Sequence, residues 1–171
     1  MPRPKSPNPI LRFVLKFLLL LALFGLLFGY FRTAFPQVIT SYTSLTASVA
    51  KLLIKIVGLH SDQTANVLNL ENFSVQVILE CAAVYQILVF CAAVIAFPAD
   101  KKKKFSGILL AIPIFYLIDL ARIAILLIVG NFKPQIFDFV HLYTGQIFVI
   151  FIVILAWLFW IKKFAYAGKT I

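Results

Sequence analysis

Four long apolar runs are the feature that most constrains how this chain can fold. Each is close to the length of about 20 residues that a helix needs to cross a hydrocarbon layer of about 30 Å. Hydrophobic residues make up 63% of the 171 residues, far above the share in soluble domains. The runs predict an all-α fold, a single integral membrane domain over residues 1–171 with about four transmembrane helices. These helices are expected at residues 10–31, 75–97, 105–130 and 140–161.

The first run could also be the hydrophobic region of a cleavable signal peptide. Its apolar stretch is long for such a region, and the residues that follow, from Gly29 to Pro36, lack a small-x-small cleavage site. We therefore expect an uncleaved anchor helix.

Residues 37–74, between the first two runs, are more polar. Up to His60, apolar residues recur at helical spacing opposite Lys51 and Lys55, which is typical of an amphipathic helix in the membrane interface. Residues 73–78 alternate apolar and polar, which suits a short strand or an extended lead-in to the second run. The apolar positions of the predicted helix are Leu45, Val49, Leu52, Leu53 and Ile56.

Lys and Arg outnumber Asp and Glu by 16 to 6, but they cluster in short segments between the apolar runs. Such clusters determine topology and contact anionic lipid headgroups, so no nucleic-acid partner is expected. They occur before and within the start of the first run, at residues 101–104 and after the fourth run. The positive-inside rule then makes both termini cytoplasmic and places residues 37–74 and 131–139 outside.

Ionisable side chains at membrane depth are costly unless they are paired or hydrated, so each is a candidate functional residue. Glu80 and Cys81 lie near the outer end of the second run, Asp119 and Arg122 in the last third of the third, and His141 opens the fourth. With the predicted topology, all fall in the outer half of the bilayer. Randomly tolerated polar residues would divide evenly between the halves.

These residues carry the chemistry of a cysteine acyl-transferase or protease. Cys81 would be the nucleophile, which attacks as a thiolate. His141 can accept the thiol proton and later give it to a leaving amine. Arg122 keeps its charge when buried and can stabilise an oxyanion or bind the substrate backbone.

Each residue alone has a simpler interpretation. A single cysteine in a membrane helix is usually a packing residue, as we interpret Cys91. Asp119 and Arg122 lie three residues apart and suit a buried ion pair, in which Asp119 would also orient Arg122. A histidine at a helix start is often a polar cap, and Tyr143 and Trp157 fit an aromatic belt.

The cysteines predict neither a disulfide nor a metal site. Within one helix, Cys81 and Cys91 would lie about 15 Å apart, beyond disulfide reach. One histidine and one cysteine lack the ligand spacing of a metal site, and no cofactor is expected.

Three stretches resemble the exosortase and archaeosortase family, particularly its short single-domain members of the exosortase H group. In matching order and spacing, over about residues 75–160, they read Glu80-Cys-Ala-Ala-Val-Tyr85, Asp119-Leu-Ala-Arg-Ile123 and Phe137-Asp-Phe-Val-His-Leu-Tyr143.

The resemblance implies catalytic roles for Cys81, Arg122 and His141. The supporting residues would be Glu80, Tyr85, Asp119 and Tyr143. The chain departs from the family pattern in having Asp119 where Asn is frequent, and Ala82 and Ala83 where Ser or Gly is common.

The family's activity implies a partner in a prokaryotic cytoplasmic (inner) membrane. It would be an exported, membrane-anchored protein with a C-terminal sorting tag, made of a short motif, a transmembrane helix and a basic tail. By analogy with sortases, the enzyme would cleave near the outer interface through a thioester, which then passes to an amine or to water.

Two other functions fit the same residues. A transporter or proton relay could use Glu80, Asp119, Arg122 and His141, and would not need the Cys81 thiol. A non-catalytic membrane assembly factor would tolerate the loss of all of them.

Overall fold

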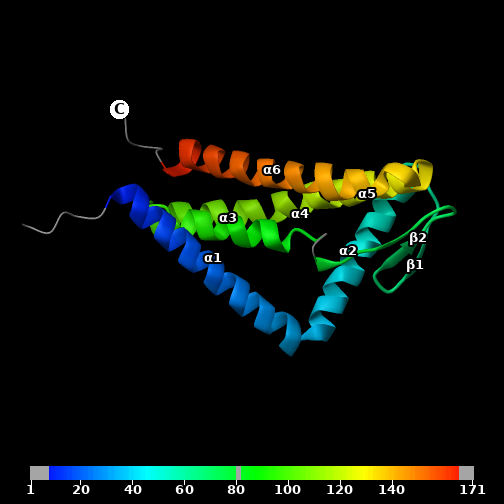
Figure 1. Cartoon of the computed structure of the whole chain (residues 1–171), viewed down its shortest axis with the longest axis horizontal. Helices are drawn as coiled ribbons and strands as arrows, with labels where there is room; N and C mark the ends of the chain where they lie inside the picture. The colour runs from blue at the N-terminus through cyan, green and yellow to red at the C-terminus, as the bar shows by residue number, and fades with distance from the viewer. Residues whose placement is uncertain (1–7, 80–81, 166–171) are drawn as a thin grey trace, which may run out of the picture.

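The computed structural model describes residues 8–79 and 82–165. It consists mainly of helices, with a small antiparallel sheet at one end (Figure 1). Three described helical stretches are long and apolar enough to cross a membrane, namely 9–34, 101–132 and 134–165, and a shorter apolar helix accompanies them. The predicted all-α membrane bundle is therefore confirmed. The main helices are α1 (Pro9–Ala34), α2 (Pro36–Ile56), α3 (Val84–Ala96), α4 (Lys101–Phe132) and α6 (Gly145–Trp160).

Helices α1 and α2 form a V whose apex is Phe35 (Figure 1). The side chain of Asn8 accepts a hydrogen bond of 3.1 Å from the Ile10 N–H and so caps α1, and Pro9 suits the first turn. Pro36 has no N–H to donate and disfavours helical backbone at Phe35, so α1 ends and α2 begins there.

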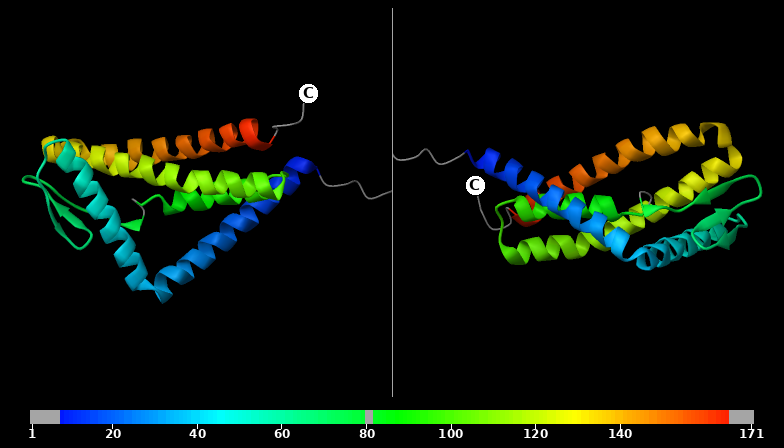
Figure 2. Two further views of the ribbon diagram at one scale, coloured as in Figure 1. Left: turned by 180° about the vertical axis from the view of Figure 1, so that it is seen from behind. Right: turned by 60° about the horizontal axis from the view of Figure 1, so that its bottom comes forward.

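The remaining long helices, α3, α4 and α6, run side by side, while α1 diverges from them toward α2 (Figure 2). Aromatic rings pack together where the start of α1 meets the bundle. Phe13 stacks on Trp157 with ring centres 5.6 Å apart, and Phe97 contacts both rings edge-on. At this end Lys103 Nζ, at the start of α4, donates to the Ala165 carbonyl at 3.4 Å, so the start of α4 and the end of the last span lie side by side.

The start of the last span is irregular. A 3-10 turn η2 (Pro134–Ile136), a single turn α5 (Phe137–Phe139) and a π segment η3 (Val140–Thr144) precede α6, and a second π segment η4 (Ile161–Ala165) follows it. Single π turns inside helices occur frequently at functional sites. The predicted position of His141, at the opening of this span, corresponds to η3.

The sheet contains β1 (Asp62–Thr64), β2 (Val67–Asn69) and β3 (Ser74–Gln76), antiparallel and in that order. Of the two possibilities for residues 73–78, a short strand or an extended lead-in, the structure shows a short strand, β3. Leu68 pairs with Val75, and the sheet packs on α2 and α4 through one buried apolar cluster. Its buried members are Ala47, Ala50, Ile54, Leu68, Leu70, Val77, Ile123 and Leu127.

The second predicted span differs from the structure at its start. We expected a helix from Val75, but Val75 pairs in β3 and α3 begins only at Val84. Residues 75–83 are mostly apolar, as the residues of a membrane helix are. Hydropathy alone therefore does not distinguish strand β3 from the start of a helix. With 13 residues, α3 is about 20 Å long and cannot cross the hydrocarbon layer alone.

The predicted amphipathic helix is confirmed as α2, and its two faces have different partners. The residues buried against the protein are small apart from Ile54: Thr43, Thr46, Ala47, Ala50 and Ile54. The larger apolar residues Leu45, Leu52 and Ile56 are exposed.

Candidate active site

Asp119 is the centre of a buried polar cluster between α3 and α4. Its Oδ2 accepts a hydrogen bond of 2.9 Å from the Ala83 backbone N–H, and its Oδ1 accepts one of 3.2 Å from Gln86 Nε2. Arg122 Nε lies 3.0 Å from Oδ1. The predicted ion pair is therefore present, and the same carboxylate also holds the start of α3.

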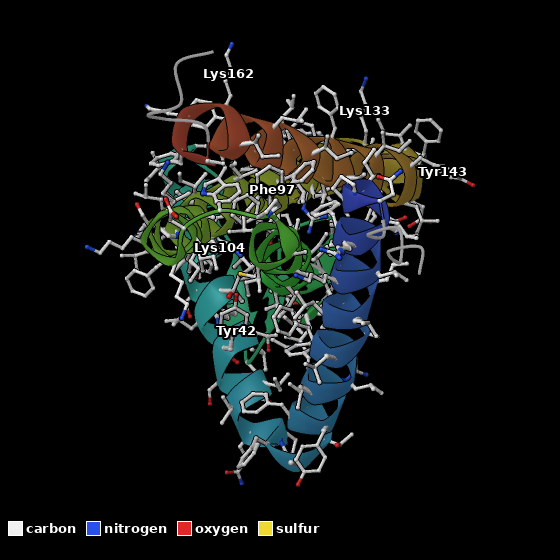
Figure 3. All side chains as sticks on the ribbon, turned by 90° about the vertical axis from the view of Figure 1, so that its left-hand side faces the viewer. Tyr42, Phe97, Lys104, Lys133, Tyr143 and Lys162 are labelled. Atoms are coloured by element: carbon white, nitrogen blue, oxygen red, sulfur yellow. The ribbon has the colours of Figure 1, made fainter. Side chains whose placement is uncertain are left out.

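Tyr42 fixes the same backbone segment from α2. Its hydroxyl donates a hydrogen bond of 3.0 Å to the Ala82 carbonyl oxygen. Burial, together with the nearby Tyr116 and Asp119, raises the pKa of Tyr42, so the phenol stays protonated and able to donate. Figure 3 shows Tyr42 in the space between α2 and the bundle.

Ala83 is left-handed, with φ +46°, and both it and Ala82 are buried. This conformation is strained for a residue with a Cβ and persists only where its surroundings fix it. Tyr42 and Asp119 supply that fixation. Non-helical backbone at membrane depth is tolerated where protein buries and pairs it, as here.

Cys81 and Glu80, predicted as nucleophile and supporting residue, lie outside the described residues. The residues that follow them, Ala82 and Ala83, are the ones tied to Tyr42 and Asp119. Cys91 is a free, half-buried thiol in the middle of α3.

Arg122 is held by α4 with its side chain only 10% exposed. Its Nη2 is buried and has no hydrogen-bond partner among the described residues. Together with Val140 and other apolar residues of α4 and α6, it lines a cavity of about 420 Å³. A guanidinium N–H in such a place is a donor without an acceptor, which a carbonyl or oxyanion would supply.

His141 lies in η3, close enough to Arg122 to interact with it electrostatically. Its ring stacks on Phe137 at 5.5 Å with the planes 6° apart, and Phe137 in turn contacts Phe73 at 4.6 Å. Its Nδ1 is buried without a hydrogen-bond partner among residues 8–79 and 82–165. Asp119 and Arg122 thus form an ion pair within α4, and His141 of the last span lies within electrostatic range of Arg122.

Two predicted supporting residues lie elsewhere. Tyr85 is exposed and meets Phe28 of α1 edge-on at 5.6 Å, so it lines the groove between α1 and α3. Tyr143 is exposed and points outward from the start of the last span (Figure 3).

Sequence reasoning missed Tyr42 and Gln86. Gln86 is a polar but uncharged residue inside an apolar run, and it would have been found if the search for ionisable residues had been extended to all polar side chains. Tyr42 carries no such signal, because its role depends on which face of α2 packs on the bundle.

The fold and this cluster define a multi-pass helical membrane protein with a buried polar site. The model of the transmembrane exosortase family matches residues 10–160, which is most of the chain, and the chain therefore belongs to this family. No curated protein and no solved structure gave a match.

Proposed function

We propose that this exosortase is a cysteine transpeptidase or protease of a prokaryotic cytoplasmic membrane. It cleaves the C-terminal sorting signal of exported, membrane-anchored proteins near the extracytoplasmic interface, with both of its termini cytoplasmic. The observation that carries the proposal is the position of Asp119. This one carboxylate contacts both Arg122 and the backbone two residues after Cys81.

The reaction uses three side chains. His141 accepts the Cys81 thiol proton, and the thiolate attacks the carbonyl carbon of the scissile peptide bond. Arg122 donates to the oxyanion from its unpartnered Nη2. The C–N bond then breaks, His141 protonates the leaving amine, and a thioester remains on Cys81. An acceptor amine or water, deprotonated by His141, attacks the thioester and releases the product.

The membrane contributes proximity. A substrate held by its own transmembrane helix diffuses in two dimensions and presents the flanking peptide at a fixed depth. This reduces the orientational entropy that a soluble encounter would cost.

The test is co-expression with a tagged protein from the same genome, followed by immunoblotting for the processed form. Wild type is compared with Cys81→Ala, Arg122→Ala and His141→Ala. Cys91→Ala is the matched control, since it removes the other thiol from the same region. We expect processing by wild type and Cys91→Ala alone.

Processing that survives in Cys81→Ala would refute the nucleophile assignment. A proton relay through Asp119, Arg122 and His141 predicts that Cys81→Ser keeps full function, whereas our proposal predicts its loss.

A further inference from the structure

Strand β3 is an edge strand of the sheet. The strand order β1-β2-β3 leaves one side of β3 without a partner strand among the described residues. Proteins usually protect such edges with charged side chains or proline. The sequence of β3, Ser-Val-Gln, contains neither.

The register shows which backbone groups face the open side. Phe73 accepts from the Leu70 N–H at 2.8 Å, and the Val77 N–H donates to Asn66 at 2.8 Å. In an antiparallel ladder the direction of these groups alternates along the strand. Phe73, Val75 and Val77 therefore pair toward β2, and the N–H and C=O groups of Ser74 and Gln76 point away from it.

A groove of about 200 Å³ borders this run of the chain. One wall is formed by residues 74–78, and the other walls are formed by Ile123 and Leu126 of α4 with Phe137 and His141. The Phe73–Phe137 contact joins β3 to the segment that carries His141. The groove thus has the outward-facing backbone groups of Ser74 and Gln76 on one side and His141 on another.

The other edge strand is in a different situation. β1 begins with the charged Asp62 and is tied to α2 through Gln63. Gln63 Nε2 donates to the Ser44 carbonyl and Gln63 Oε1 accepts from Ser48, both at 3.0 Å. Only the β3 edge adjoins a catalytic candidate.

We propose that the recognition motif of the substrate binds as an extended strand along β3, pairing with the backbone of Ser74 and Gln76. This inference rests on the proposed function and specifies how that site recognises its substrate. Donors and acceptors repeating every second residue match another extended backbone, and the apolar walls accept alternate side chains. An extended peptide is therefore the ligand class whose backbone donors and acceptors have the spacing found along β3.

The position of β3 links recognition to cleavage. Cys81 follows Gln76 by five residues, and the chain between them includes the buried Val77 and Leu79. A strand paired with β3 would lie between residues 74–78 and His141, which form two walls of the groove. Its backbone is thereby fixed, and a bond a few residues beyond the paired motif is presented for attack.

Gln76→Pro tests the pairing from the enzyme side. It removes an N–H that faces the groove and none that the β2 ladder uses, and Gln76→Ala is the matched control that keeps the N–H. We expect Gln76→Pro to process the co-expressed tagged protein about three- to tenfold more slowly than Gln76→Ala, as the loss of one hydrogen bond implies. Equal processing by Gln76→Pro and Gln76→Ala would overturn the proposal and leave the proposed function standing.

If Gln76→Pro does not fold, a second measurement tests the same proposal. Synthetic tag peptides, comprising the motif and its transmembrane helix, are N-methylated one position at a time and given to the wild-type enzyme in liposomes. We expect N-methylation to reduce the rate of cleavage at every second position of the motif and not at the positions between, because only alternate N–H groups of the peptide face β3. Uniform tolerance of methylation would overturn the proposal. Absence of cleavage even of the unmethylated peptide, with no processing in cells, would remove the proposed function and this inference with it.

Discussion

The Asp119 side chain accepts a hydrogen bond from the backbone N–H of Ala83, which lies 36 residues earlier in the chain. This bond and the ion pair to Arg122 give the carboxylate two separable tasks. Asp119→Asn keeps an acceptor for the backbone and removes the charge, whereas Asp119→Ala removes both. We expect Asp119→Ala to lose about 3 kcal/mol of stability, because the buried Ala83 N–H and the buried Arg122 guanidinium both lose their oxygen acceptor, whereas the amide oxygen of asparagine still serves one of them. Asp119→Asn should lose less and retain processing.

Thermal unfolding in detergent and the processing assay measure both effects. The exposed Asp62 of β1 provides the control, since Asp62→Asn should change neither. Equal damage from Asn and Ala at position 119 would show that the charge alone matters and that the backbone anchor does not.

Arg122→Lys separates charge from geometry. Lysine still balances Asp119, so the fold should be retained, but it lacks the planar fork that places a donor at Nη2. Loss of one oxyanion donor typically costs about 100-fold or more in rate. We expect such a loss in processing without a shift in unfolding temperature. Full activity of Arg122→Lys would exclude a directed guanidinium contact.

Tyr42→Phe removes the hydroxyl that holds the Ala82 carbonyl oxygen. We expect a loss of about 1 kcal/mol in stability and slower processing at neutral pH. Because the folded state raises the pKa of Tyr42 above its ordinary value of 10.0, the stabilisation is complete below pH 10 and falls as pH rises through the folded pKa. Wild type should therefore lose stability more steeply than Tyr42→Phe above pH 10, as measured by unfolding across pH. Parallel curves would contradict this role of the hydroxyl.

Gly130→Ala probes the support of His141. A Cβ at Gly130 would collide with the ring of Phe73, which packs on Phe137 and so on His141. Gly107→Ala is the matched variant at the other end of α4, where a Cβ would meet the indole of Trp160. Both variants should unfold at lower temperature. Processing by the folded fraction should fall only for Gly130→Ala, and an equal fall for both would assign the effect to stability.

The sequence was most informative where one residue type decides the outcome. Long apolar runs define α1 and α4, and rare charges inside such runs mark Asp119 and Arg122. It was least informative where a contact depends on tertiary packing. Nothing local shows that the Tyr42 hydroxyl reaches the Ala82 carbonyl oxygen, because that contact depends on how α2 packs on the bundle. Leu68 and Val75 pair within neighbouring strands, but the apolar residues from Val75 onward also fit the start of a helix.

The shortness of α3 has a consequence for the surrounding lipid. A helix of about 20 Å in a hydrocarbon layer of about 30 Å leaves roughly 10 Å to the non-helical segment before it. Hydrophobic mismatch therefore falls on the residues that Tyr42 and Asp119 hold in place. We therefore expect processing to depend on acyl-chain length, because bilayers of shorter chains reduce the mismatch and bilayers of longer chains increase it.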